Sequence, residues 1–277
     1  MCSFFILYVG LVIGAAPLLV HSHGYLSFPA ARQYKCFRDN NFWWPEDGSA
    51  IPDDACKHAY QTIYAKYRSQ GESSGVAANA AQYMFQQYYE YAAIAGANYE
   101  DLNHVKQNVV SHSLCAAGAD YRSDAFGDKS GIDEPHPAWR ADTLYVDTKQ
   151  KYSRGIHVKL HFCPTAVHEP SYFEVFISKR EYNYTHELTW DDLEFIGGDN
   201  SQLIDNDGSD PLCAHEQLYI IPVTIPFRIR KFVLYVRWQR NDVVGEGFYN
   251  CADVVFDDYL LTHRPAVRRR HHKQNEL

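Results

Sequence analysis

The sequence lacks several patterns that would assign a function at once. It contains no CxxC pair and no HExxH motif, which argues against a thiolate zinc cluster and against a zinc hydrolase. It also has no internal repeat, no low-complexity block and no proline- or glycine-rich linker. Its 277 residues are 46% hydrophobic and 22% charged, the balance of a chain that buries a core. These absences together predict a single folded domain.

Charged residues are missing from the first 22 positions, which contain no Asp, Glu, Lys or Arg. The apolar run there is short for a bilayer span and is interrupted by Gly14 and Pro17. It ends in Val20-His21-Ser22, and small residues at the first and third of these positions favour signal-peptidase cleavage. We therefore predict a signal peptide over 1–22, a secreted chain that begins at His23, and no membrane association after cleavage. The alternative is an uncleaved anchor helix, which the polar, turn-rich sequence that follows disfavours.

The cysteines divide at the predicted cleavage site. Cys2 is lost with the signal peptide, so an even number enters an oxidising compartment, which predicts three disulfides. The cysteines concerned are Cys36, Cys56, Cys115, Cys163, Cys213 and Cys251. A local bridge between Cys36 and Cys56 is favoured because only nineteen residues separate them. The sequence leaves the other pairings open.

A secreted chain can also carry glycans. The sequence Asn183-Tyr184-Thr185 is an N-glycosylation acceptor and falls in a predicted loop. We therefore expect a glycan on Asn183 when the protein passes through a eukaryotic secretory pathway.

Acidic residues outnumber basic ones except at the C-terminus. The formal net charge is −8, and the segment from Arg264 onward holds five basic residues against Glu276. The acidic body argues against a nucleic-acid partner. We divide the chain into a domain over 23–263 and a basic tail over 264–277, which is most simply a solvated terminus. Its last four residues, Gln-Asn-Glu-Leu, loosely resemble an endoplasmic-reticulum retention signal.

Two different periodicities follow one another along the chain. Apolar positions three and four residues apart predict a helix over 56–67, and an alanine-rich stretch without proline predicts a second helix over 77–95. Alternating apolar and polar residues then predict strands that include 158–162 and 173–177, and 232–238 is a further strand candidate. Short strands separated by turn residues predict a mainly β protein, an immunoglobulin- or fibronectin-III-like β-sandwich with the helical region inserted between early strands.

Cleavage before His23 would create a metal chelate. An N-terminal histidine offers its α-amino nitrogen and its imidazole Nδ1 to the same ion, and a second histidine would complete three nitrogens in one plane. Nitrogen ligands in a plane favour copper over zinc. His168 is the best partner because it lies between two predicted strands, where a loop is held by a rigid frame.

Several segments resemble known families. The chitin-binding lytic polysaccharide monooxygenases are similar at 23–36, 165–168 and 245–253. The fusolin (spindolin, spheroidin-like) proteins of insect viruses are similar at 42–45, 81–87, 115–120, 126–131 and 236–240. The resemblance extends from residue 23 to about residue 259 and so covers nearly all of the predicted mature chain.

The resemblance implies a site and an activity. His23 and His168 match the two histidines of a copper brace, and Phe248 matches the apolar ring on one axial side of the metal. Ala166 matches the small residue that shapes access on the other side, and Glu246 matches a polar group beside the oxygen-derived ligand. The implied protein is a secreted copper-dependent monooxygenase that cleaves chitin oxidatively, with an external electron donor and dioxygen or hydrogen peroxide as partners.

Other functions remain open at this point. One is a non-catalytic chitin-binding or spindle-forming viral protein, which would self-associate and be retained in spindles derived from the endoplasmic reticulum. The other is a zinc hydrolase that uses the same histidines, which the absence of a suitably spaced Glu disfavours.

Aromatic residues make up 15% of the chain and include 21 tyrosines. A ring that stacks on sugar and a hydroxyl that hydrogen-bonds to it suit a polysaccharide surface. We predict substrate contacts at Tyr25, Trp43 and Trp44, with Tyr60 and Tyr64 as further candidates; burial in the core is the competing explanation for each of them.

Overall fold

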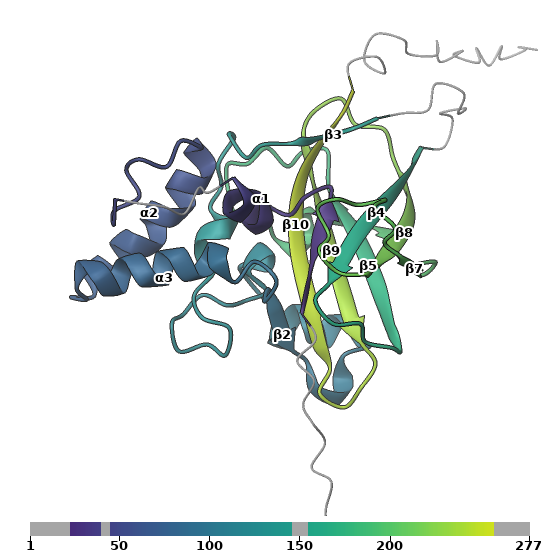
Figure 1. The fold of residues 1–277 in the computed structure, drawn as a ribbon, viewed down its shortest axis with the longest axis horizontal. Coiled ribbons are helices and arrows are strands. Elements are labelled where there is room, and N and C mark those ends of the chain that lie inside the picture. Colours follow the sequence, from purple (N-terminus) through teal and green to yellow (C-terminus); the bar gives the residue numbers. More distant parts are fainter. Residues whose placement is uncertain (1–22, 40–44, 146–154, 258–277) are drawn as a thin grey trace, which may run out of the picture.

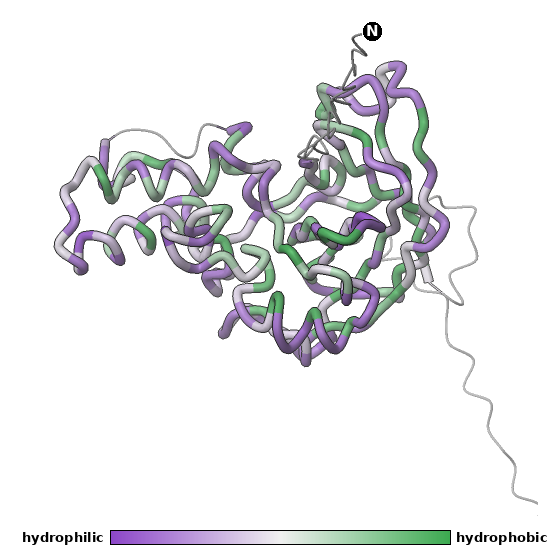
Figure 2. Tube along the Cα trace, turned by 90° about the horizontal axis from the view of Figure 1, so that it is seen from below, coloured by the Kyte–Doolittle hydropathy of each residue, from purple (hydrophilic) through white to green (hydrophobic). Residues whose placement is uncertain are grey.

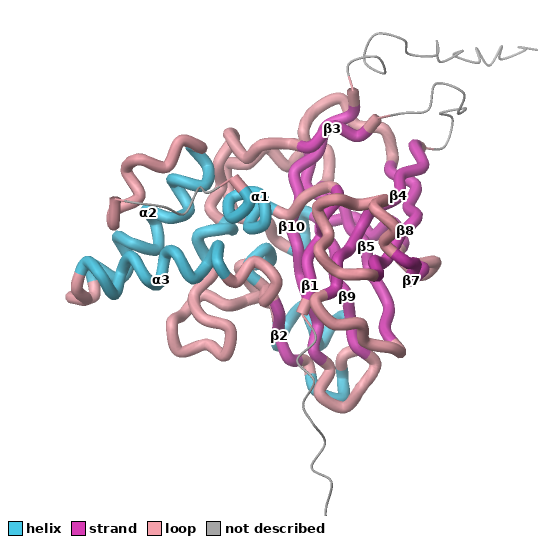
Figure 3. The backbone as a smooth tube through the Cα atoms, viewed as in Figure 1, coloured by secondary structure: helices cyan, strands magenta, loops and turns pink. Residues whose placement is uncertain are grey.

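The computed structural model describes residues 23–39, 45–145 and 155–257. The predicted signal peptide over 1–22, the predicted substrate contacts Trp43 and Trp44, and the basic tail over 264–277 lie outside these residues. Helices gather on one side of the molecule and strands on the other (Figures 1 and 3).

The strands occupy most of the second half of the chain. They are β1 (Gly24–Phe28), β2 (Ala92–Ile94), β3 (Asp142–Leu144), β4 (Ile156–Pro164), β5 (Ser171–Ser178), β6 (Leu193–Gly197), β7 (Gln202–Asp205), β8 (Gln217–Ile225), β9 (Phe232–Arg240) and β10 (Glu246–Phe256). The longer helices are α1 (Arg32–Arg38), α2 (Asp54–Ser69) and α3 (Ser74–Gln86). Short helical turns complete the description: η1 (Gly96–Asn98), α4 (Leu102–His104), η2 (Val105–Val109), η3 (Leu114–Ala116), η4 (Ser130–Asp133) and η5 (Trp190–Asp192).

The strands form two sheets. One has four strands in the order β1-β4-β8-β7, and the other has six, in the order β2-β10-β9-β5-β6 with β3 beside β10. All neighbours are antiparallel except β3, which runs parallel to β10. The predicted β-sandwich with an inserted helical region is confirmed, because α1 to α3 lie between β1 and β2 in the chain.

The six-stranded sheet is buried on both faces. Along β9, Leu234, Val236 and Trp238 pack into the core between the two sheets, whereas Val233 and Tyr235 pack into a second core under the helices. Every residue of β9 is therefore buried, and its first five residues, 232–236, are apolar on both faces instead of alternating with polar residues. Figure 2 shows hydropathy along the trace, with green hydrophobic stretches inside the strand-rich part of the molecule and purple hydrophilic residues in many of the outer loops.

The helices bury the stripes that the sequence predicts. In α2 the apolar residues Tyr60, Ile63 and Tyr67 face the core under the six-stranded sheet. Each of the two long helices has an N-cap side chain, Asp53 before α2 and Ser73 before α3, that accepts a hydrogen bond from a backbone N–H of the first turn.

The predicted helix over 77–95 is wrong in its second half. Helix α3 ends at Gln86, and Ala92–Ile94 instead form strand β2, which pairs with the start of β10. Tyr91, just before β2, is fully buried, and its hydroxyl donates to the carbonyl oxygen of Met84. The alanines of this segment have a helical composition, but pairing with a distant strand satisfies their backbone groups and overrides it.

All three predicted disulfides are present. Cys36 bonds to Cys56, as the sequence favoured, and this bridge joins α1 to α2. The pairings that the sequence left open are Cys115–Cys251, between the helical region and β10, and Cys163–Cys213, at the end of β4. Within the described ranges, no helix is both long enough and apolar enough to cross a membrane.

Candidate functional site

His23 lies at one end of the sandwich, beside the loop that carries His168. Its carbonyl oxygen accepts hydrogen bonds from the backbone N–H of Thr165, at 2.7 Å, and from the hydroxyl of the same residue, at 3.0 Å. Thr165 follows β4, and His168 comes three residues later in the β4–β5 loop. The antiparallel pairing of β1 with β4 therefore joins the predicted N-terminus to the loop of the second histidine.

The β4–β5 loop is held from two further sides. The hydroxyl of Tyr219, buried on β8, lies 3.2 Å from the carbonyl oxygen of His168 and 2.9 Å from the Glu169 carboxylate. From the β9–β10 turn, the backbone N–H of Asn241 donates to the carbonyl oxygen of Pro170 at 3.0 Å. His168 thus stands in a loop whose backbone is held at three points, by His23, Tyr219 and Asn241, as a ligand position requires.

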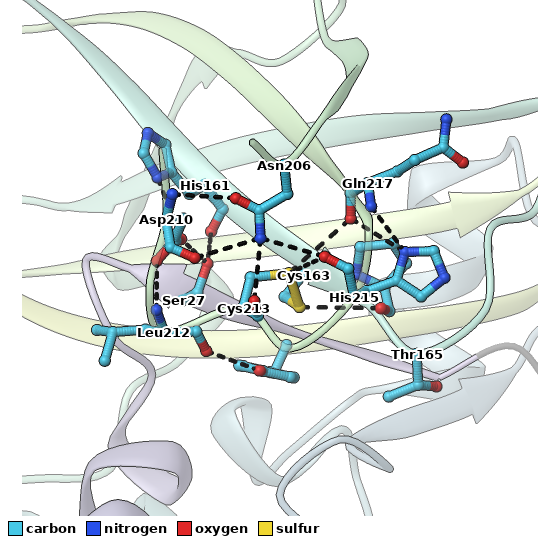
Figure 4. The surroundings of a disulfide bond; sticks show 12 residues. Ser27, His161, Cys163, Thr165, Asn206, Asp210, Leu212, Cys213, His215 and Gln217 are labelled. Atoms are coloured by element: carbon cyan, nitrogen blue, oxygen red, sulfur yellow. Dashed lines mark hydrogen bonds and ion pairs between the residues drawn. A yellow bond between two sulfur atoms is a disulfide. The ribbon is translucent and has the colours of Figure 1, made fainter. Parts of the chain in front are cut away.

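A disulfide and a polar network stabilise the strands below this loop (Figure 4). Cys163, which pairs with Tyr25 on β1, is bonded to Cys213. Asp210 accepts hydrogen bonds from Ser27 at 2.6 Å and contacts the His161 ring at 3.1 Å, so it joins β1 to β4. The side-chain amide of Asn206 donates to three carbonyl oxygens of the loop that carries Cys213.

A chain of charged contacts connects His168 to Glu246. Nε2 of His168 lies 3.2 Å from an Asp242 carboxylate oxygen, and that carboxylate lies 2.7 Å from the Arg240 guanidinium. A second nitrogen of Arg240 lies 2.6 Å from the Glu246 carboxylate. Arg240 and Glu246 are buried, so the pair holds its geometry with little screening by solvent.

Phe248 lies two residues after Glu246 on β10. Its ring is fully buried and its centroid is 6.1 Å from that of the His23 ring, in an edge-on arrangement. The Trp238 ring also packs against that of Phe248, with the two centroids 5.2 Å apart. The structure therefore brings His23, His168, Glu246 and Phe248 to one end of the sandwich, and Ala166 lies half-buried in the same β4–β5 loop.

The local charges affect the protonation of two groups. Burial and the Arg240 charge lower the pKa of His168, and together they outweigh the Asp242 carboxylate, which acts in the opposite direction. Burial would raise the pKa of Asp242, but the backbone N–H of Gly245 and the Arg240 guanidinium lower it. The result is a neutral imidazole beside an ionised carboxylate, and the neutral imidazole is the form that binds metals.

Sequence reasoning missed several residues at this end. Arg240 is the last residue of β9 and Asp242 lies two residues later in the β9–β10 turn, and nothing in their local sequence indicates a contact with the β4–β5 loop. Tyr89 was also missed; its ring is half-buried and 5.5 Å from that of His23. Ile94 and Val243 are large apolar residues on this end that are 54% and 83% exposed.

The predicted substrate contact at Tyr25 is wrong. Tyr25 is only 3% exposed, and its hydroxyl donates to the carbonyl oxygen of Leu212 at 2.9 Å. It packs among Tyr34 and Tyr88, so its ring belongs to the core between the sheets. Tyr60 is likewise fully buried in the core under the helices, and Tyr64 is partly buried against the same core.

The predicted glycosylation acceptor Asn183 is exposed and lies in the loop after β5, where its side chain accepts a hydrogen bond from the Thr185 hydroxyl at 2.7 Å.

We predict that Gly245→Ala disturbs this end of the sandwich. Gly245 has φ +62°, and a Cβ there would overlap the carbonyl oxygen of Gly96. The left-handed conformation alone costs roughly 1–2 kcal/mol in a residue with a Cβ, and the overlap adds to it. Thermal denaturation should show a lower midpoint. Gly75→Ala in α3 is the matched control, since its Cβ meets no atom within 4 Å and alanine favours a helix. An unchanged midpoint for Gly245→Ala would contradict the assignment of strain to this turn.

The donor set at this end fits copper. Two imidazoles and, after the predicted cleavage, one amine would supply nitrogen ligands, and the buried Phe248 ring gives an apolar neighbour. Across the described residues, no three His, Cys, Asp or Glu side chains are grouped so that they could hold a metal. The implied copper brace would use only two side chains, both histidines, with the backbone amine as its third ligand. It therefore does not require a group of three such side chains.

Comparison with known proteins agrees with this geometry. A family model described as lytic polysaccharide mono-oxygenase, cellulose-degrading, matches residues 23–254. The spindolin of Heliothis armigera entomopoxvirus is 45% identical over 90% of this chain and 71% of its own length. That of Choristoneura biennis entomopoxvirus is 41% identical over 90% of this chain and 73% of its own length.

Solved structures lead to the same group. An entomopoxvirus fusolin, described by its effect on virulence and its in vivo crystallisation into viral spindles, has a TM-score of 0.79 at 46% identity and covers 88% of this chain and 80% of its own. A copper complex of the cellulose-active CelS2 has a TM-score of 0.55 at 23% identity, covers 85% of this chain and 99% of its own, and shows only that the fold is shared. The match of the family model and the identity to the viral proteins together show that this chain belongs to the lytic polysaccharide mono-oxygenase family and is a relative of the entomopoxvirus fusolins.

Proposed function

We propose that this chain is a secreted copper-dependent monooxygenase that cleaves chitin oxidatively. The observation that carries the proposal is the convergence of His23, the His168 loop and the buried Phe248 at one end of the sandwich. The family match begins at residue 23, which supports His23 as the first residue of the mature chain.

The proposed ligands are the amine and imidazole of His23 and the imidazole of His168. Copper held there would supply one-electron chemistry with an external reductant and with dioxygen or hydrogen peroxide. Phe248 would keep a further ligand from one side because its ring is apolar, and Ala166 would leave space on the other. Glu246 would act from its ion pair with Arg240, which holds the carboxylate in place.

Asp242 has a supporting part in this proposal. Its carboxylate contacts both the ring of His168 and the guanidinium of Arg240. Outer groups of this kind orient an imidazole and tune its basicity. Asp242 would therefore position His168 and Glu246 relative to each other.

The substrate surface we propose lies around Tyr89, Ile94 and Val243. These residues are exposed or half-exposed at the same end as His23, and an apolar surface with an aromatic ring suits the flat face of a polysaccharide. The family description names cellulose, whereas CbpD of Pseudomonas aeruginosa, named a chitin-binding protein, is 26% identical over 87% of this chain and 49% of its own length. The name of CbpD, and the resemblance of 23–36, 165–168 and 245–253 to the chitin-binding lytic polysaccharide monooxygenases, favour chitin.

The test is an analysis of products. The mature protein, loaded with copper and supplied with ascorbate, should release oxidised oligosaccharides from β-chitin that mass spectrometry identifies. Cellulose in a parallel reaction decides between the two polysaccharides, and a reaction without ascorbate is the control for released contaminants. Oxidised products from cellulose alone would contradict the assignment of chitin, and none from either substrate would contradict catalysis.

A second candidate function is a self-associating, chitin-binding viral protein. The similarity to fusolins that crystallise into viral spindles favours it. Retention of the protein on β-chitin without oxidised products, in the presence of copper and ascorbate, would support this function over the first.

A further inference from the structure

A basic pocket lies at the opposite end of the sandwich from His23. Its basic lining residues are Lys179, Arg180, Arg228, Arg230 and Lys231. They come from the loop after β5 and the loop before β9. Strand β5 begins three residues after His168 and ends at Ser178, and its eight residues span roughly 26 Å at about 3.3 Å each. The pocket is therefore remote from the candidate copper site.

The two ends of the six-stranded sheet are easily located. Strand β2 pairs with the start of β10 at Glu246, and β3 pairs with its end at Phe256. Figure 1 shows β2 at the bottom of the sheet and β3 at the top. Phe232, which lines the pocket, begins β9 and pairs with Val254, so the basic pocket lies at the β3 end.

Backbone carbonyl groups hold three of the cations. Lys179 donates to the carbonyl oxygen of Asp191, and Arg180 donates to that of Phe227 at 3.0 Å. Lys231 donates to the carbonyl oxygens of Pro137 and Trp139 at 2.6 and 2.7 Å. A carbonyl oxygen fixes the position of a cation without neutralising its charge. The positive charges are therefore held close together, and each side chain keeps donors for another acceptor.

Arg228 provides an independent observation, because one of its buried donors has no acceptor among the described residues. The side chain is 5% exposed, and its Nε–H has no hydrogen-bond partner among the described residues. One terminal nitrogen lies 3.2 Å from Glu194, a carboxylate that is 43% exposed. Burial is the main cause of the lowered pKa of Arg228, and the neighbouring Arg180 adds to it. A buried donor without an acceptor is costly, and an anion that binds beside it would relieve that cost.

We propose that the basic pocket binds an oxyanion of the phosphate or sulfate class. Its cavity of about 200 Å³ is many times what a single water needs, so a polyatomic anion can enter. Tetrahedral oxyanions suit the pocket because a guanidinium donates two parallel hydrogen bonds to them, and ammonium groups add charge. The body of the protein is acidic, so this local positive charge does not follow from its net charge. The anion is either free in solution or carried as an ester on a sugar.

Calorimetric titration of the full-length secreted protein at low ionic strength tests this proposal. The probes are inorganic phosphate, inorganic sulfate, and a sulfated disaccharide alongside its unsulfated form. We expect binding of at least one anionic probe and none of the unsulfated sugar. Binding of the inorganic ions identifies a site for free anions, and binding of the sulfated disaccharide alone identifies a site for sugar-borne sulfate.

Two variants and a control make the test specific. Arg180→Gln with Arg230→Gln removes two exposed cations without opening the core, and it should weaken binding by at least about tenfold. Arg228→Lys keeps the charge but loses the planar donor pair, so it should weaken binding as well. Lys159→Gln removes an exposed cation from β4 and should change the affinity by less than about twofold. Absence of binding by every anionic probe, or an equal loss in the Lys159→Gln control, would overturn the proposal.

Discussion

Replacing His23 by alanine should abolish copper binding at neutral pH and the release of oxidised products from β-chitin. The change removes one of two proposed imidazole ligands and leaves only the amine and His168. Loss of a supporting group beside a metal ligand already costs about 10–100-fold in metal affinity, so loss of the ligand itself should cost more. Titration with copper, followed by calorimetry, measures the affinity directly and is independent of turnover.

Three further variants distinguish a ligand from a structural residue. His168→Ala should have the same effect as His23→Ala. A chain with one glycine added before His23 keeps both imidazoles but removes the free amine from His23, and it should also lose affinity. His157→Ala is the matched control, because this histidine is exposed on β4 of the four-stranded sheet. Unchanged copper affinity in the extended chain would refute the proposed brace.

Replacing Cys115 and Cys251 together by alanine should cause the largest loss of stability among the three disulfide pairs. The bridge closes a sequence separation of 136, against 20 for Cys36–Cys56 and 50 for Cys163–Cys213. In the chain-entropy account, a separation above about 100 is worth roughly 5 kcal/mol, and one near 20 about 3 kcal/mol. Both cysteines are also fully buried, so alanine leaves unfilled space in the core under the helices.

Scanning calorimetry under non-reducing conditions measures this effect. A loss of that size should lower the midpoint by roughly 10–20 °C in a domain of this length. The Cys36→Ala/Cys56→Ala variant is the control and should lose less. Cys115 is also positioned by Asp133, whose carboxylate accepts from the backbone N–H groups of Cys115 and Ala116 at 2.7 and 2.8 Å. A smaller loss for the Cys115–Cys251 pair than for the Cys36–Cys56 pair would show that closure of a long loop does not dominate here.

Local patterns in the sequence predicted much of the fold. The alternation around Val158 and Val175 predicted β4 and β5, and the apolar spacing from Tyr60 to Tyr67 predicted α2. Both patterns record which face of an element is buried, so they can be recognised without the partner that covers it. The prediction failed at Ala92–Ile94, where the local composition is helical and the strand exists only through its pairing with β10.

In the candidate site, too, some residues could be predicted from the sequence and others could not. The proposed metal ligands His23 and His168 could be identified because a predicted cleavage site and a loop between two predicted strands mark them. Their charged neighbours could not, because Asp242 and Arg240 contact His168 and Glu246 only after β9 and β10 have formed a turn against the β4–β5 loop. The burial of Tyr25 was equally hidden, since a tyrosine that faces sugar and one that faces the core have the same local sequence context.

The sequence by itself determined the number of disulfides, the two-part order of helices and strands, and the donor types available for a metal, because these depend on residue identity and short-range periodicity. The tertiary structure alone decided two of the three disulfide pairings, the polar network around His168, and which aromatic rings are buried. It also decided where the five cations of the basic pocket meet. These features depend on contacts between residues far apart in the chain, and only the packing of the two sheets and the helical region brings those residues together.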